Sequence, residues 1–255
     1  MFTYAGELSV LISVIIFCII GYLLGSISFA IIFTKKFLGT DIREHGSGNA
    51  GMTNVMRTAG KLPGILTFVC DFLKGTVAVL LAKFLYAPLA NWLFSIGITN
   101  HHTLSLSSYV ITDAETCLNP ELVGSIVAIF CLLGHIFPIF FKFKGGKGVA
   151  TLVGAGAAFS PFTALCSFIV FGVVLLMSEY VSLASIIAVI SAVPFTYLFF
   201  KDGGTFIWFG NYQVWVAVIC TAIMSTMVVI KHHENIGRLI KGTERKISDK
   251  KRKKG

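Results

Sequence analysis

Residues 45–57 combine glycines with small polar side chains in a pattern suited to binding an anion. The segment holds three glycines, four hydroxyl or amide side chains and one arginine: Gly46, Ser47, Gly48, Asn49, Gly51, Thr53, Asn54 and Arg57. Glycines let backbone N–H groups approach a ligand closely, and the hydroxyl, amide and guanidinium groups supply further donors. The alternative is a polar turn between two helices, in which Ser47 or Thr53 caps a helix.

A second glycine-rich segment precedes an apolar stretch typical of a helix. It contains Lys144, Gly145, Gly146, Lys147 and Gly148. A helix N-terminus presents free N–H donors and a partial positive charge, so we expect a phosphate-binding loop here. It is not a Walker A loop, because Gly148 rather than Ser or Thr follows Lys147. The alternative is a flexible loop whose lysines only mark the inner side of a membrane.

The third polar cluster, residues 231–235, follows the last apolar stretch and contains His232, His233 and Asn235. Histidine titrates near neutral pH and is a candidate acid or base, although interfacial histidines also serve as anchors. Beyond the cluster, apolar residues recur at helical spacing at Ile236, Leu239 and Ile240. This spacing predicts a short amphipathic helix in the headgroup layer.

Few other side chains in the apolar stretches could do chemistry. Asp71 and Lys74 are one helical turn apart, and we expect them to neutralise each other, with Lys74 close enough to the inner face to reach a ligand. We expect His135 to form a helix-packing hydrogen bond. The sequence has no Gly-x-Ser-x-Gly and no Cys-x-x-Cys, so neither a serine nucleophile nor a zinc site is indicated.

The segments that must position these clusters are strongly apolar. Of the 255 residues 55%, about 140, are hydrophobic and only 13% are charged. One membrane span needs about 20 mostly apolar residues, so there is room for about seven spans. This excludes an ordinary globular enzyme and a disordered chain. The apolar stretches are 8–33, 63–86, 122–141, 149–177, 181–200 and 213–230.

The basic residues predict which ends of the spans lie inside. Lys and Arg are frequent in 34–62, in 142–148 and after residue 230, whereas 87–121 has none. Basic loops stay on the cytoplasmic side. Clustering at the ends of apolar segments also distinguishes the net charge of +9 from that of a nucleic-acid-binding protein, so we expect no nucleic-acid partner.

The stretch 149–177 must cross the membrane twice, because one crossing would place the basic tail outside. Ser160-Pro161 lies near its middle and disfavours a continuous helix. Two helices of about 12 and 17 residues are expected there. We therefore predict an all-α, polytopic integral membrane protein with seven transmembrane helices, two of them short, with the N-terminus outside and the C-terminus inside.

All three polar clusters then lie at the inner ends of spans. Their donors and cations indicate an anionic substrate, most simply a phosphorylated one. Burial in lipid makes an amphiphile with a phosphate headgroup a natural partner.

Five residue strings resemble those of the bacterial acyl-phosphate:glycerol-3-phosphate acyltransferases (PlsY). They are GSGNAGMTN…R at 46–57, DFLKG at 71–75, GHIFPIFFKFKGGKGVAT at 134–151, SEYVSLASI at 178–186 and HHENIGRL at 232–239. Order, spacing and topology agree along nearly the whole chain. The outer loop 87–121 and the basic tail look like extensions, and Met52 stands where the family usually has a smaller residue. Spacing to Glu234-Asn235 matches His232 rather than His233.

The resemblance implies transfer of a fatty acyl group from acyl phosphate to the 1-hydroxyl of sn-glycerol 3-phosphate, giving lysophosphatidic acid and phosphate. It implies no metal, no cofactor and no thioester donor, and it allows for functional coupling to the enzyme that makes acyl phosphate. The implied catalytic residues are Ser47, Arg57, Lys147 and His232. The implied substrate-binding residues are Gly46, Gly48, Asn49, Thr53, Asn54, Lys144, Gly145, Gly146, Gly148 and Asn235.

The resemblance also implies a multi-pass protein of the bacterial plasma membrane with its active site on the cytoplasmic side. We expect one membrane acyltransferase domain at 1–247 and a basic cytoplasmic tail at 248–255. The group that deprotonates the glycerol hydroxyl stays open between His232 and the phosphate of the donor, which we favour. Rival functions are a membrane transporter of organic phosphates and a scaffold with a lipid-binding tail.

Overall fold

The computed structural model describes residues 7–98, 118–201 and 214–249, and its regular structure in these ranges is helical throughout. Much of the predicted outer loop 87–121 and the lysines at 250–254 lie outside the described residues. The helices are α1 (Glu7–Ser26), α2 (Phe29–Leu38), α3 (Met52–Thr58), α4 (Lys61–Ser95), α5 (Pro120–Ile136), α6 (Val149–Phe159), α7 (Pro161–Ser178), α8 (Val181–Phe200), α9 (Val214–Lys231) and α10 (His233–Ile240). Two short 3₁₀ turns are η1 (Ile42–Glu44) and η2 (Ile139–Phe141).

The prediction of seven spans, two of them short, agrees with the helices. Six segments of the described chain are long and apolar enough to cross a membrane, and α6 is a shorter apolar helix of 11 residues. The predicted division at Ser160-Pro161 is confirmed: Pro161 occupies the first turn of α7, and the Ser160 hydroxyl accepts a hydrogen bond from the Thr163 N–H at 3.2 Å. Proline in the first turn and serine at the cap are typical helix starts.

The first predicted span, 8–33, is not one helix. The chain leaves helical geometry at Ser28, whose φ and ψ are −92° and 92°, and α2 continues to Leu38. The break frees the Ile27 carbonyl, which accepts a hydrogen bond from Lys74 Nζ at 2.8 Å. A tertiary partner on α4 therefore compensates the lost helical bond.

Two other boundaries differ from the prediction. Helix α4 continues past residue 86 to Ser95 with Pro88 in its interior. Helix α5 ends at Ile136 rather than at residue 141, because Pro138 disfavours helical geometry in the residue before it. The following turn η2 leads the chain into the glycine-rich loop.

Helices α4 and α6 cross at close range, which fixes the start of α6. A Cβ atom on Gly75 would lie 2.3 Å from the Thr151 carbonyl oxygen, and one on Gly154 would lie 1.9 Å from the Phe72 carbonyl oxygen. The Thr76 hydroxyl also donates to the Gly154 carbonyl at 2.8 Å. Small residues at such crossings let membrane helices approach closely.

The expected neutralisation of Asp71 by Lys74 is present, with 2.8 Å between Oδ1 and Nζ and both side chains buried. His135 Nδ1 lies 3.6 Å from the same carboxylate oxygen and 3.2 Å from the Thr151 hydroxyl. His135 therefore links α4, α5 and α6, in agreement with its predicted helix-packing role.

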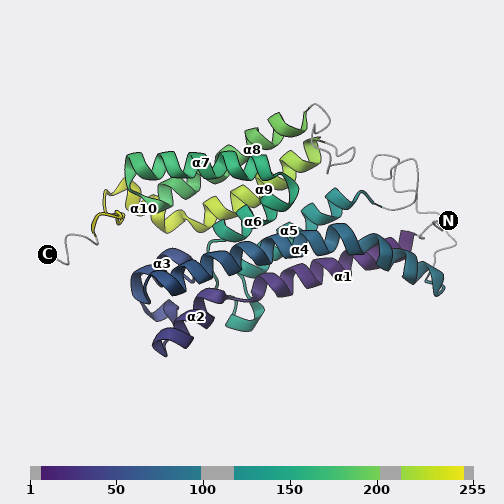
Figure 1. The fold of residues 1–255 in the computed structure, drawn as a ribbon, viewed down its shortest axis with the longest axis horizontal. Helices are drawn as coiled ribbons and strands as arrows, with labels where there is room; N and C mark the ends of the chain where they lie inside the picture. Colours follow the sequence, from purple (N-terminus) through teal and green to yellow (C-terminus); the bar gives the residue numbers. More distant parts are fainter. Residues whose placement is uncertain (1–6, 99–117, 202–213, 250–255) are drawn as a thin grey trace.

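The long helices run lengthwise through the bundle, and α3 and α10 lie at the same end (Figure 1). Helix α1 begins at the opposite end. The predicted amphipathic helix is present as α10, whose Ile240 side chain is 81% exposed. Polar segments far apart in the sequence thus gather at one end of an apolar bundle.

Candidate active site

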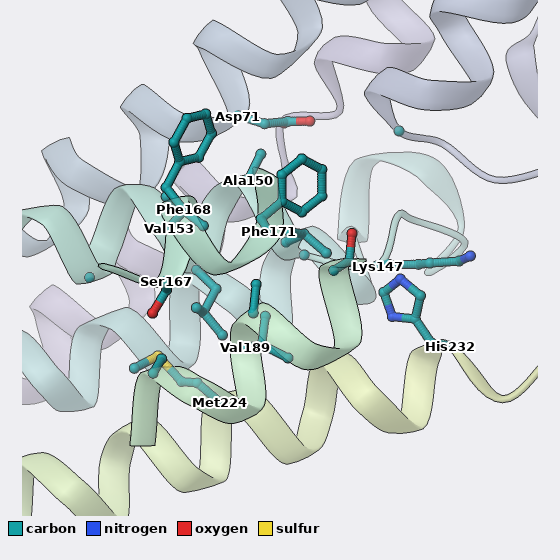
Figure 2. A pocket seen from close by; sticks show the side chains of 18 of the residues that line it. Asp71, Lys147, Ala150, Val153, Ser167, Phe168, Phe171, Val189, Met224 and His232 are labelled. Atoms are coloured by element: carbon teal, nitrogen blue, oxygen red, sulfur yellow. The ribbon is translucent and has the colours of Figure 1, made fainter. Parts of the chain in front are cut away.

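A cavity of about 490 Å³ extends from this polar end into the bundle. Figure 2 shows Lys147 and His232 at one end of it and Ser167, Phe168 and Met224 farther along. The polar end is lined by residues from all three polar clusters, which confirms their predicted convergence: Gly46, Ser47, Asn49, Thr53, Asn54, Arg57, Lys147, Gly148, His232 and Asn235.

The remainder of the cavity is mainly apolar. Its walls come from helices α4 to α9 and include Phe68, Val153, Phe171, Val189 and Met224. A cavity with a cationic, donor-rich end and an apolar body matches the shape of an amphiphile with an anionic headgroup.

Asn54 holds the first loop together. Its side-chain oxygen accepts from the Ser47 N–H at 3.1 Å, and its amide Nδ2 donates to the His45 carbonyl at 2.9 Å and the Asn49 carbonyl at 3.1 Å. The side chain is buried. These bonds use its oxygen and its amide hydrogens on the loop backbone, so Asn54 shapes the wall around Ser47 and has little capacity left for a ligand.

Arg57 projects from α3 to the cavity and is half-buried. Burial lowers the pKa of Arg57 below its ordinary value, and repulsion from the Arg245 guanidinium makes a smaller contribution in the same direction. Arginine stays charged at physiological pH in any case. The structure therefore places a permanent, partly desolvated cation at the polar end, where its interaction with an anion is stronger than in water.

Part of the predicted phosphate-binding loop packs against the end of α5 instead of facing the cavity. The Gly145 N–H donates to the Ile136 carbonyl at 3.2 Å, and the Gly146 N–H donates to the His135 carbonyl at 3.1 Å. Cβ atoms at these positions would lie 2.0 Å and 2.3 Å from atoms of His135. The two glycines thus let the loop lie against the end of α5, and their N–H groups are already bonded within the fold.

Four of the predicted substrate-binding residues do not line the cavity: Gly48, Lys144, Gly145 and Gly146. Lys144, Gly145 and Gly48 line a separate hollow beside Asp41 and Arg43. Lys144 is exposed and Gly146 is buried. The part of the loop that does reach the cavity is Lys147 and Gly148, together with Val149 and Ala150 of the first turn of α6.

Lys147 joins the glycine-rich loop to α10. Its Nζ donates a short hydrogen bond to Asn235 Oδ1. Burial, with a smaller contribution from Arg238, lowers the pKa of Lys147 to about 8. The ammonium group is therefore less stabilised by water than a surface lysine and can gain more from an anionic ligand.

His232 and His233 differ in position. The His232 side chain is buried, lines the cavity and lies 2.8 Å through Nδ1 from the Val228 carbonyl. A carbonyl only accepts, so Nδ1 holds the proton and Nε2 has the free lone pair. Burial lowers the pKa of His232 to about 4, so the ring is neutral at pH 7. His233 is exposed and bonds the Ile230 carbonyl at 3.0 Å.

Four residues at the polar end were missed by the sequence-based prediction. They are Ser182, Arg238, Glu244 and Arg245. Ser182 and Arg238 lie within two of the strings that resemble the family, but Glu244 and Arg245 lie after α10, outside all five strings. Asp71 and His135 also reach the cavity wall, although both are bonded within the fold.

Comparison with known proteins gives consistent matches over most of the chain. A family model described as glycerol-3-phosphate acyltransferase matches residues 15–242. A glycerol-3-phosphate acyltransferase of Bartonella quintana is 37% identical over 92% of this chain and 92% of its own length. One from Clostridioides difficile is 38% identical over 94% of this chain and 98% of its own length.

Two solved structures have the same fold. One is a crystal structure of PlsY, an integral membrane glycerol 3-phosphate acyltransferase, in its glycerol 3-phosphate form. It has a TM-score of 0.69 and 36% identity, and the match covers 92% of this chain and 96% of that one. The lysophosphatidic acid form of PlsY has a TM-score of 0.67 and 35% identity, and it covers 92% of this chain and 95% of that one.

Proposed function

The chain belongs to the glycerol-3-phosphate acyltransferase family, and we propose that it takes its acyl group from acyl phosphate. It is a multi-pass membrane enzyme that acylates glycerol 3-phosphate. In the proposed reaction the 1-hydroxyl oxygen of sn-glycerol 3-phosphate attacks the acyl carbonyl carbon. The bond between that carbon and the phosphate oxygen breaks, which yields lysophosphatidic acid and inorganic phosphate.

The observation that supports this function best is the division of one cavity into a cationic end and an apolar body. Arg57 and Lys147 stand at the polar end, and the body is lined by residues such as Phe171 and Met224. An acyl phosphate needs both environments, with its phosphate beside the cations and its chain in the apolar body. Glycerol 3-phosphate needs only the polar end, so the reacting groups of the two substrates meet there.

Arg57 and Lys147 offset the repulsion between two phosphorylated substrates and stabilise the charge that develops on the leaving phosphate. Lys147 directly precedes Gly148 and the first turn of α6, where N–H groups without helical partners add donors for a phosphate. Ser47 and Asn49 supply neutral donors from the facing loop, and Thr53 supplies one from the first turn of α3. The Asn235 amide orients Lys147. Since acyl phosphate is a mixed anhydride with a good leaving group, no covalent enzyme nucleophile is required.

The proton of the attacking hydroxyl passes to the donor phosphate in this proposal. The alternative acceptor is Nε2 of His232, which has a free lone pair. The pKa of His232, lowered to about 4, makes it a weak base at neutral pH. The donor phosphate gains basicity as its bond to the acyl carbon breaks, so it is better matched to the reaction. His232 would then accept a hydrogen bond from the hydroxyl and orient it.

The charge distribution supports an N-terminus outside and a C-terminus inside, in the plasma membrane of a bacterium. The polar end of the cavity lies with the basic segments and would face the cytoplasm, where both phosphorylated substrates are available. Functional coupling to the enzyme that makes acyl phosphate fits this placement. We retain 1–247 as one domain and 248–255 as a basic tail near membrane lipid.

The test is synthesis of lysophosphatidic acid by the purified protein in detergent or vesicles, with acyl phosphate as sole donor and EDTA present. We expect lysophosphatidic acid and phosphate in equal amounts, and none from acyl-CoA or acyl carrier protein. Product formation from a thioester alone would contradict the proposal.

Two rival functions are tested by the same preparation. A transporter would move labelled glycerol 3-phosphate into sealed vesicles without an acyl donor, whereas we expect no uptake above empty vesicles. A scaffold that acts through its basic tail would lose function when residues 250–255 are deleted. An enzyme whose site lies in the bundle should keep most of its activity.

A further inference from the structure

Glu244 reaches the polar end of the cavity from the C-terminal segment that follows α10. Its Oε1 accepts hydrogen bonds from Asn235 Nδ2 at 2.7 Å and from the Ser182 hydroxyl at 2.8 Å. Its Oε2 accepts from Arg238 Nε at 2.6 Å. The side chain is only 8% exposed. One carboxylate thus joins α8 to α10 and contacts Asn235, the residue that binds Lys147.

This carboxylate differs from the other acidic side chains of the cavity wall. Among the described residues that line the cavity, the acids besides Glu244 are Asp71 and Glu121. Those two pair with Lys74 and Lys83 inside the bundle, each at 2.8 Å. Glu244 is therefore the carboxylate that stands among the substrate-facing cations.

Lys147, Asn235 and Glu244 form a line of side chains joined by two hydrogen bonds. Only one orientation of the central amide satisfies both bonds. A carboxylate only accepts hydrogen bonds and an ammonium only donates them. The Asn235 amide between them must turn its NH₂ to Glu244 and its oxygen to Lys147, as the structure shows. Without the charge on Glu244, Lys147 alone favours this orientation of the amide, so the orientation is held less firmly.

We propose that Glu244 is a positioning residue for acyl transfer, which orients Asn235 and Arg238 and thereby fixes Lys147 at the polar end of the cavity. The inference rests on the proposed function and extends it to a segment beyond residue 242, where the family match ends. In this role Glu244 acts through its neighbours and not directly on the substrates or the leaving group.

The C-terminal segment is itself fastened to the bundle, so Glu244 is held in place. The Ile247 N–H donates to the Glu179 carbonyl at 3.1 Å, and the Ser248 hydroxyl donates to the Glu179 carboxylate at 3.0 Å. Glu179 lies between α7 and α8 and does not line the cavity. A variant at Glu179 weakens the same attachment without touching the line of three side chains.

Glu244 also affects when Lys147 loses its charge. The charged groups that face Lys147 come from α3, α10 and the C-terminal segment and are Arg57, Glu234, Arg238 and Glu244. The neighbouring His232 is neutral above pH 5 because burial lowers its pKa to about 4. Glu244 raises the pKa of Lys147, and Arg238 lowers it. Removing the negative charge should therefore move the loss of activity at high pH to lower pH.

The experiment compares Glu244→Gln with Glu179→Gln in the full-length protein, with acyl phosphate as donor. For Glu244→Gln we expect kcat to fall about 10- to 100-fold, the loss typical of a misplaced catalytic group, while the KM for glycerol 3-phosphate changes less. The basic limb of its pH profile should shift down by about one pH unit. For Glu179→Gln we expect parental kcat and pH profile.

Parental kcat and an unshifted basic limb in Glu244→Gln would overturn the proposal. An equal fall in kcat in both variants would also overturn it, because the C-terminal segment would then act only by its attachment to the bundle. If Glu244→Gln does not accumulate in the membrane, Glu244→Asp takes its place. This variant keeps the charge, so we expect a lower kcat with the parental basic limb of the pH profile. A shifted basic limb in Glu244→Asp would contradict the role of the charge. Activity of the parent protein in the same assay reports separately on the proposed function.

Discussion

Lys147 Nζ donates a hydrogen bond to Asn235 Oδ1 across 88 positions of the sequence. The bond links the loop before α6 to helix α10, so the two segments that supply the cation and the histidine are held as one unit. Arg57 faces them from α3 on the same cavity. The site therefore depends on three helix ends that the bundle brings together.

Arg57 should be required for turnover. Replacing Arg57 with Ala removes a permanent cation from the polar end, and we expect kcat/KM to fall about 100-fold or more. The control is Lys61→Ala, which removes an exposed cation at the start of α4 outside the cavity. Steady-state rates of lysophosphatidic acid formation measure both. Similar rates for Arg57→Ala and Lys61→Ala would contradict the assignment.

The rate should fall at high pH as Lys147 loses its proton. Its pKa is lowered to about 8, so the ammonium is present below that pH and lost above it. We expect kcat/KM to decline as pH rises through about 8, and Lys147→Arg, if active, to lack this decline because arginine keeps its charge. A flat parental profile between pH 7 and 10 would rule out a required ammonium at Lys147.

The two adjacent histidines should respond differently to the same substitution. His232 is buried in the cavity and His233 is exposed. We expect His232→Asn to lower kcat substantially and His233→Asn to retain the parental rate. If the donor phosphate takes the proton, the pH profile of His232→Asn should keep the parental shape at a lower rate. An acid limb near pH 4 that disappears in His232→Asn would instead identify His232 as the base.

The buried ion pair should matter to stability. Asp71→Asn leaves Lys74 without its charged partner inside the bundle, at an expected cost of about 3–5 kcal/mol. The double variant Asp71→Asn with Lys74→Met should recover part of this loss, because it no longer buries an unpaired charge. Thermal midpoints in detergent at pH 7 compare the two. A double variant less stable than Asp71→Asn would contradict this explanation. It would mean that the hydrogen bond from Lys74 to the Ile27 carbonyl contributes more to stability than the unpaired charge costs.

The sequence was sufficient to predict features that depend on local pattern. Apolar length predicts the spans, and charge parity with Ser160-Pro161 predicts the division between α6 and α7, which is confirmed. Gly46 to Arg57 and the segment around Lys147 were predicted to meet because both follow the inner ends of spans, and they line one cavity.

Features that depend on distant contacts could not be predicted in this way. The break before α2 is compensated by Lys74, which lies 47 positions from Ile27. Gly145 and Gly146 have the composition of a phosphate loop, but their N–H groups bond the end of α5. Glu244 follows α10 among basic residues, and its place at the cavity depends on contacts with Ser182, 62 positions earlier.

The most direct test of the account is the rate of lysophosphatidic acid formation from acyl phosphate and glycerol 3-phosphate by the parent protein and by Lys147→Ala, without thioesters or added metal. Lys142→Ala, which removes an exposed cation five residues away, is the matched control. We predict similar turnover by the parent and by Lys142→Ala. For Lys147→Ala we predict a rate that is lower by about 100-fold or more. An unchanged rate in Lys147→Ala, or a parent protein active only with a thioester donor, would contradict it.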